Sequence, residues 1–133
     1  MGVSKSKNEG ERSRPRIFIV DDEPLLLELA QSILSDLPCD LQTFTNPEVA
    51  LQTFAAAEKP PDLVITDFAM HEMDGMDLIR ECRRRNPNQK VLMVSGTVDE
   101  SIYADTDVKP DRFLAKPYQP AALLKLVREL LGI

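Results

Sequence analysis

The sequence predicts an α/β protein in which five parallel strands form one sheet, in the order 2-1-3-4-5, with helices on both faces. Short runs of apolar and β-branched residues alternate along the 133-residue chain with segments of helical periodicity. Most of these runs are apolar throughout, as in parallel strands that helices cover on both sides. The second run is more polar, which suits an edge strand, and the handedness of strand crossovers leaves few other topologies.

The first predicted strand, Ile17–Val20, follows a polar segment without periodicity. Residues 1–14 are therefore expected to form a flexible tail, and the domain to span residues 15–133. Pro24 suits the first turn of the helix that comes next. Pro38 is expected to stop this helix, whose core-facing residues are predicted to be Leu26, Leu29, Ile33 and Leu37.

Two further strand–helix units are predicted in the middle of the chain. The second strand covers residues 40–44, and Asn46 caps a helix whose apolar face holds Ala50, Phe54 and Ala57. The third strand covers residues 63–66 and precedes a helix from Gly75 to about Asn86, with Leu78, Ile79 and Cys82 toward the core. The arginine run that ends this helix is expected to be solvated: Arg83, Arg84 and Arg85.

The last third of the chain is predicted to hold two more strands and the final helix. The fourth strand covers residues 91–94, and the segment 97–110 is expected to form a short, weak fourth helix because of its β-branched residues and Pro110. The fifth strand covers residues 113–115. The last helix, residues 120–131, directs three residues toward the core: Leu123, Val127 and Leu130.

Composition restricts the class of protein. Hydrophobic residues make up 43% and charged residues 29% of the chain, and no apolar run approaches the roughly 20 residues that cross a bilayer. The net charge is −6, so direct nucleic-acid binding by the domain is not expected. The N-terminus lacks an apolar signal core, and Cys39 and Cys82 have no metal-binding or redox spacing. We expect a cytoplasmic protein with both cysteines in its core.

Polar residues stand where the predicted strands end. The first strand is followed by Asp21 and Asp22, the third by Asp67, the fourth by Ser95 and the fifth by Lys116. The carboxyl ends of parallel strands share one rim of the sheet, where open α/β folds bind ligands. Carboxylates without histidine or cysteine suit Mg²⁺. A carboxylate held beside a cation and an ammonium can attack phosphorus and carry the group as an aspartyl phosphate.

Four segments carry a resemblance to a known family. They are Ile19-Val20-Asp21-Asp22-Glu23, Thr66-Asp67 through Met73-Asp74-Gly75, Val94-Ser95-Gly96, and Phe113-Leu114-Ala115-Lys116-Pro117. Each is weakly specific alone, but their order and spacing are highly specific. Over residues 16–133 the chain resembles a response-regulator receiver domain of two-component signalling, which has the flavodoxin-like doubly wound fold.

The resemblance implies a role for each site residue. Asp67 would accept a phosphoryl group from a sensor histidine kinase or a histidine phosphotransfer protein. Asp22 and Asp67 would bind Mg²⁺, with Asp21 acting through water and the backbone carbonyl of Ala69 as a further ligand. Lys116 and Ser95 would contact the phosphoryl group, and the bond between Lys116 and Pro117 is expected to be cis.

The resemblance also implies a switch. Ser95 would move toward the phosphoryl oxygens, and the ring of Phe113 would fill the space it leaves. The output partner would bind the surface formed by the fourth helix, the fifth strand and the last helix. Such a domain is no enzyme in the usual sense, since it catalyses only its own phosphorylation and dephosphorylation. His71, which stands where the family usually has proline, is expected to be an exposed loop residue.

Other interpretations stay open. One is a pseudo-receiver, an interaction module with the same fold but no phosphotransfer. Another is a Mg²⁺-dependent, aspartate-based phosphohydrolase of the haloacid-dehalogenase kind, which needs a second aspartate two residues after its nucleophile. Ala69 and Glu23 stand at those positions here, which disfavours the hydrolase. Whether the chain is a stand-alone receiver or part of a longer regulator is not decided by its residues.

Overall fold

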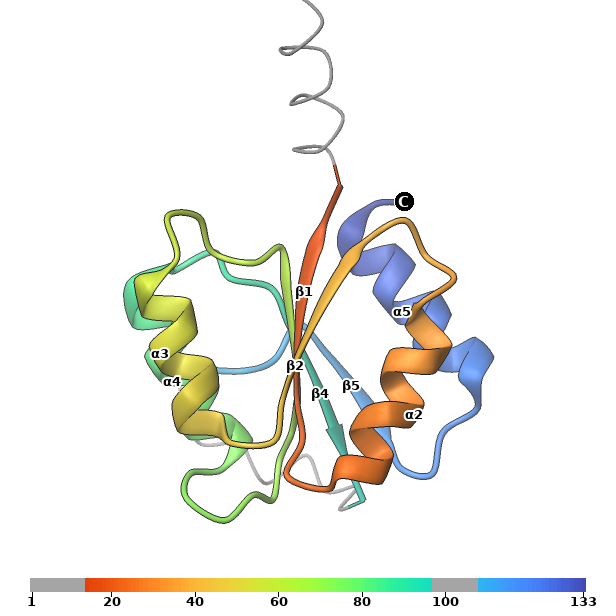
Figure 1. The fold of residues 1–133 in the computed structure, drawn as a ribbon, viewed down its shortest axis with the longest axis horizontal. Helices are drawn as coiled ribbons and strands as arrows, with labels where there is room; N and C mark the ends of the chain where they lie inside the picture. Colours follow the sequence, from red (N-terminus) through yellow and green to blue (C-terminus); the bar gives the residue numbers. More distant parts are fainter. Residues whose placement is uncertain (1–13, 97–107) are drawn as a thin grey trace, which may run out of the picture.

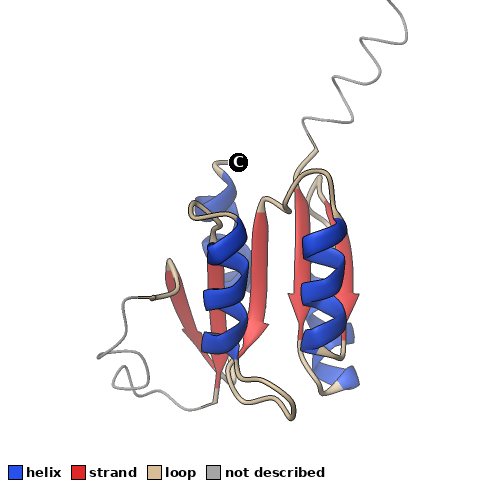
Figure 2. Cartoon of the chain, turned by 90° about the vertical axis from the view of Figure 1, so that its left-hand side faces the viewer, coloured by secondary structure: helices blue, strands red, loops and turns tan. Residues whose placement is uncertain are grey.

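The computed structural model describes residues 14–96 and 108–133, whose strands form one parallel sheet. The strand order β2-β1-β3-β4-β5 is the predicted one. Figure 2 shows the strands running toward the same edge of the sheet. The strands are β1 (Arg16–Val20), β2 (Asp40–Phe44), β3 (Leu63–Asp67), β4 (Val91–Ser95) and β5 (Arg112–Ala115). The polar strand β2 lies at an edge, as its sequence indicated.

Helices cover both faces of the sheet, so the core has two layers (Figure 1). The helices of the described residues are α2 (Pro24–Leu34), α3 (Pro47–Ala56), α4 (Gly75–Arg85) and α5 (Pro120–Leu131). Ile17 and Ile19 of β1 pack in the layer of α2 and α5, whereas Phe18 and Val20 pack in the layer of α3 and α4. Successive strand residues point to opposite faces, so a fully apolar strand serves both layers.

The buried face of α2 differs from the predicted one. The helix ends at Leu34, before Pro38, and it buries Leu27, Ala30 and Leu34, while Leu29 is 51% exposed. The cause is that leucines at consecutive positions create two overlapping apolar stripes, and only packing against the sheet selects one. Leu37 is buried, as expected, but from the turn after the helix, where its N–H donates to the carbonyl of Leu34.

The helices α3 and α4 begin as predicted. The side chain of Asn46 accepts hydrogen bonds from the N–H groups of Glu48 and Val49 and so caps α3. At the start of α4, Asp74 and Asp77 form a reciprocal capping box. The predicted core residues Ala50 and Phe54 of α3 and Leu78, Ile79 and Cys82 of α4 are buried, as is Cys39.

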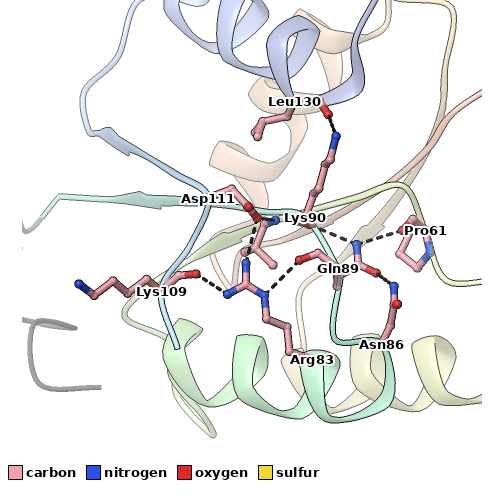
Figure 3. Close-up of polar contacts among 9 residues, drawn as sticks. Pro61, Arg83, Asn86, Gln89, Lys90, Lys109, Asp111 and Leu130 are labelled. Atoms are coloured by element: carbon pink, nitrogen blue, oxygen red, sulfur yellow. Dashed lines mark hydrogen bonds and ion pairs between the residues drawn. The ribbon is translucent and has the colours of Figure 1, made fainter. Parts of the chain in front are cut away.

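The arginines at the end of α4 have different environments. Arg83 donates to the backbone carbonyls of Gln89 and Lys109 and to the carboxylate of Asp111, as Figure 3 shows. Its side chain is 20% exposed, whereas that of Arg84 is 69% exposed. The expectation of a solvated helix end is therefore wrong for Arg83, which connects α4 to the chain just before β5.

Two expectations fall on residues that the structure does not describe. They are the flexible tail, apart from Arg14, and most of the segment expected to form the fourth helix, since residues 1–13 and 97–107 lie outside the described part. Arg14 pairs with Asp40 at 2.7 Å. Over residues 14–96 and 108–133, none of the helices has the length and apolar character needed to span a membrane.

Candidate phosphoacceptor site

The polar residues at the strand ends meet at one edge of the sheet. Asp67 and Ser95 are the last residues of β3 and β4, Asp21 follows β1, and Lys116 follows β5. These strands are adjacent in the order β1-β3-β4-β5 and run parallel, so their carboxyl ends share a rim. The backbone joins them further, because the N–H of Lys116 donates to the carbonyl of Ser95.

Three carboxylates form the centre of the site. Oxygens of Asp21, Asp22 and Asp67 all lie within 4.8 Å of one another. Asp21 and Asp67 are 7% exposed, and Asp22 is half-buried. Charges packed so closely repel unless cations offset them. A donor set made only of carboxylate oxygens is the kind that Mg²⁺ binds, so these residues fit that ion.

Lys116 is the ammonium group that reaches this cluster. Its Nζ lies 3.1 Å from Oδ2 of Asp21 and 3.4 Å from Oδ1 of Asp67. The bond between Lys116 and Pro117 is cis, as expected. One ammonium group neutralises only part of the negative charge of the three carboxylates. The remaining negative charge would favour binding of a cation.

The site changes the proton affinity of its residues. Burial raises the pKa of Asp67, and the neighbouring charge of Asp21 adds to this, although the contact with Lys116 acts in the opposite direction. Burial would lower the pKa of Lys116, but its hydrogen bond with Asp21 and the charges of both aspartates outweigh burial and raise it. Lys116 therefore stays an ammonium, while the charged form of Asp67 is destabilised by its surroundings.

The residues expected to act in a switch lie on one face of the sheet. Met93 pairs in register with Phe113, and Ser95 with Ala115. Because alternate residues of a strand share a face, Ser95 lies on the same side as Met93 and Phe113. Ser95 is buried, and Phe113 is half-buried against the α3–α4 layer.

The loop after Asp67 is fixed at its ends. The N–H of Phe68 donates to Oδ1 of Asp67, and the N–H of Gly75 donates to the carbonyl of Phe68 at 2.7 Å. Gly75 closes the loop because a Cβ there would lie 2.5 Å from the carbonyl oxygen of Asp67. Ala69 and His71 are exposed along this loop, and Nε2 of His71 lies 3.5 Å from Oδ2 of Asp22.

An apolar hollow adjoins the carboxylates, and the sequence did not reveal it. Its volume is about 290 Å³, and Asp21, Asp67 and Lys116 are among the residues that line it. It lies between the sheet and α2: strands β1, β3 and β4 and the turn after β5 also line it, and α5 contributes Leu123. The lining residues outside the strands include Leu26, Leu29, Ala30, Pro117 and Tyr118. Burial and the charge of Asp21 raise the pKa of Tyr118, against the effect of Lys116. The only signal in the sequence was the excess of leucines near the start of α2.

Comparison with known proteins defines the class of protein. The model of the response regulator receiver domain matches residues 17–128, and the chain belongs to this family. It is 33% identical over 123 residues to the response regulator protein PilR of Pseudomonas aeruginosa. The match covers 91% of this chain but only 27% of PilR. The chain therefore spans about a quarter of that relative.

Two further relatives match over nearly their whole length. The chemotaxis protein CheY of Thermotoga maritima is 26% identical over 117 residues, which cover 86% of this chain and 96% of CheY. The structure of the response regulator TrrA from Thermotoga maritima, in complex with Mg²⁺ and BeF, superposes with a TM-score of 0.75 at 28% identity. That match covers 87% of this chain and 98% of TrrA. The chain is thus a signalling domain of two-component systems with the flavodoxin-like fold.

Proposed function

We propose that Asp67 is the phosphoacceptor of this receiver domain and that its phosphorylation switches the binding of an output partner. The observation that carries the proposal is the position of Asp67 at the end of a buried strand, within 3.4 Å of Lys116 and within 4.8 Å of two other carboxylates. A carboxylate so placed is a nucleophile next to groups that can stabilise an incoming phosphoryl group.

The transfer step is simple in its bonds. A carboxylate oxygen of Asp67 attacks the phosphorus of a phosphohistidine, and a P–O bond forms as the P–N bond breaks. The leaving imidazole keeps the electron pair of the broken bond and takes up a proton. Asp67 must be ionised to attack, and the contact with Lys116 favours the ionised form against the effect of burial.

The other residues assist in separate ways. Asp22, Asp67 and the backbone carbonyl of Ala69 would hold Mg²⁺, with Asp21 acting through water. The bound cation would supply positive charge beside the oxygens of the transferred group. Lys116 is already in contact with Asp67 and would donate to one of those oxygens. Ser95 would donate from its hydroxyl to another.

The switch would follow from the contact between Ser95 and the phosphoryl group. As Ser95 turns toward the phosphoryl group, the ring of Phe113 moves into the space on the same face of the sheet. Phe113 belongs to β5, which together with α5 and the segment before β5 would form the surface that an output partner reads. The chain alone would act as a signal receiver, and the partner would carry the response.

A protein donor has a suitable docking surface beside the site. Leu25 and Leu29 of α2 are 79% and 51% exposed, and the second of them lines the apolar hollow together with Asp67. A sensor histidine kinase or a histidine phosphotransfer protein that covers these leucines would place its phosphohistidine near Asp67. Exposed apolar groups beside a reactive carboxylate favour a protein donor.

The test is phosphorylation by a small-molecule phosphodonor with Mg²⁺, read by intact mass. We expect the wild type and the control Asp36→Asn, which alters an exposed carboxylate beyond α2, to gain the mass of one phosphoryl group. Asp67→Asn should show no gain, and EDTA should abolish the gain in the wild type. A gain that persists in Asp67→Asn would overturn the assignment, and no gain in any form would favour a pseudo-receiver.

A further inference from the structure

We propose that His71 is a metal-selectivity residue: its imidazole supplies a nitrogen ligand to the divalent cation held by Asp22 and raises the preference of the site for transition-metal ions over Mg²⁺. The inference rests on the proposed function, because it concerns the cation of the same site. It concerns the one position in the loop after Asp67 where a side chain with a nitrogen ligand faces the carboxylates.

The separation of the two side chains suits a shared ion. Nε2 of His71 lies 3.5 Å from Oδ2 of Asp22. Two ligand atoms bonded at about 2.1 Å to one ion lie roughly 3.0 Å apart at a right angle and about 3.4 Å apart at a tetrahedral angle. The observed distance is close to the second value, so only a small movement is needed for both atoms to bind one cation.

The side chains of Asp22 and His71 also differ in exposure in a way that suits binding of one cation. The side chain of Asp22 is 15% exposed, whereas that of His71 is 93% exposed. The carboxylate is therefore fixed by its surroundings, while the imidazole can rotate onto an ion without disturbing the core. The loop that carries His71 is tied down by the bond from Gly75 to Phe68 and by the capping box of Asp74. These contacts restrain the loop at its ends, so the imidazole stays within reach of Asp22.

The chemistry of the ligand predicts the direction of the effect. Mg²⁺ prefers oxygen ligands and keeps its waters, so it gains little from an imidazole. Ions such as Co²⁺ and Zn²⁺ accept imidazole nitrogen readily, and their affinity for mixed nitrogen and oxygen sites is higher. A receiver site made of carboxylates with one histidine at its edge should therefore favour these ions more than a site of carboxylates alone.

A competing explanation is that His71 only orients Asp22. An exposed polar contact of this kind contributes little, and it would act on every bound cation alike. The two explanations differ in one measurable quantity, which is the ratio of the affinities for Co²⁺ and Mg²⁺. Direct ligation changes this ratio, whereas orientation of Asp22 leaves it unchanged.

The experiment measures the Kd of Mg²⁺ and of Co²⁺ by calorimetry, with the absorption spectrum of Co²⁺ as a second readout, on the whole chain without phosphodonor. Two variants accompany the wild type: His71→Asn and the control Glu72→Gln. Glu72 is the exposed neighbour of His71, and both residues line a second hollow, which contains Asp22 and is distinct from the apolar hollow. Its substitution removes a charge at the edge of the site without removing the imidazole.

We expect His71→Asn to weaken Co²⁺ binding on the order of tenfold, the scale of one lost contact at a metal site. Binding of Mg²⁺ should stay within a factor of two, and the Co²⁺ spectrum should lose its nitrogen-dependent shift. Glu72→Gln should leave the ratio unchanged. An equal effect of His71→Asn on both ions, or none on either, would overturn the inference. Phosphorylation at Asp67 with Mg²⁺ would still stand in that case, so failure of the inference is distinguishable from failure of the proposed function.

Discussion

The side chain of Asp67 lies in a buried environment that favours its protonated, uncharged form. Its side chain is 8% exposed, and burial raises its pKa above the ordinary value of an aspartate. A raised pKa in the folded state means that the folded protein holds a proton more tightly than the unfolded chain. Ionisation of Asp67 therefore costs stability as the pH rises from the unfolded pKa through the folded one, and the cost is complete above the folded pKa.

Asp67→Asn should for this reason stabilise the fold in the absence of divalent cations. We expect a gain of about 0.5–2 kcal/mol at pH 7, the usual scale for relieving a functional site of strain or charge. The gain should shrink as the pH falls through the folded pKa toward the ordinary aspartate value of about 4, because the folded wild type takes up the proton first. Thermal melts in EDTA across this pH range are the measurement, with Asp36→Asn as control. A gain that did not depend on pH would contradict the explanation.

Gly75 shows how a residue without a side chain can position a site. A Cβ at this position would lie 2.5 Å from the carbonyl oxygen of Asp67 and 2.8 Å from the sulfur of Met93. The carbonyl belongs to the backbone and cannot move without shifting Asp67 itself. The glycine is thus required by close approach of the backbone, and not by its dihedral angles.

Gly75→Ala should therefore destabilise the protein by about 2–4 kcal/mol, the range of severe steric changes in a core. It should also lower the rate of phosphorylation, because Asp67 would be displaced. The control is Gly96→Ala, since a Cβ there meets nothing within 4 Å. Urea unfolding and the mass assay test both expectations. Similar stabilities for the two variants would show that the backbone yields easily at Gly75.

At the scale of elements, Arg83 connects α4 to the chain that enters β5. Its guanidinium donates to the carbonyl of Gln89 at 3.1 Å and to the carboxylate of Asp111 at 2.9 Å, and it also contacts the carbonyl of Lys109 (Figure 3). Asp111 in turn accepts from the N–H of Val91 at the start of β4. One side chain thus fixes three backbone segments at the edge of the sheet opposite to Asp67.

Arg83→Ala should cost about 1–3 kcal/mol, because it leaves a charged acceptor and two carbonyls without this donor. Arg84→Ala is the matched control, since Arg84 pairs only with Glu81 on its own helix among the described contacts and is mostly exposed. Its cost should stay within about 0.5 kcal/mol. Chemical denaturation measures both values. Equal losses would mean that the bonds of Arg83 are replaced by water at no net cost.

The elements also show which local features the sequence could predict. The cap at Asn46, the start of α4 at Gly75 and the apolar runs of β1, β3 and β4 depend on neighbouring residues, and each was predicted within one or two positions. The buried face of α2 depends on contacts with distant parts of the chain. Several leucines of α2 have a spacing that is compatible with burial, and periodicity alone could not predict which of them are buried.

At the scale of the whole molecule, the parallel sheet decides which surface a donor can reach. Leu29 of α2 lines the apolar hollow together with Asp67, and Leu25 is exposed on the same helix. Helix α3, which carries the 45% exposed Val49, covers the other face of the sheet (Figure 1). A protein donor should therefore need Leu25 and Leu29, while a small-molecule phosphodonor, which reaches Asp67 directly, should not.

Replacing Leu25 and Leu29 together by glutamine should slow transfer from a protein donor about tenfold or more, since hot-spot residues contribute on the order of 1–2 kcal/mol each. Transfer from a small-molecule phosphodonor should not change. Val49→Gln should affect neither reaction. Phosphotransfer rates with a phosphorylated histidine phosphotransfer protein test this, and slowing of both reactions in the double variant would point to damage at Asp67 instead of lost docking.

The sequence by itself determined the strand order and the polar residue at each strand end. The strand order follows from the polar second strand, which suits a sheet edge, and from the handedness of strand crossovers. The polar residues are found from the apolar runs, which show where each strand ends. The tertiary structure decided what depends on contacts across the fold. These features are the buried face of α2, the hydrogen bonds from Arg83 to the chain before β5, the apolar hollow beside Asp67, and the contact between His71 and Asp22. Each of these features is formed by residues that are far apart in the chain. Residue spacing along the sequence does not predict which distant segments will be in contact.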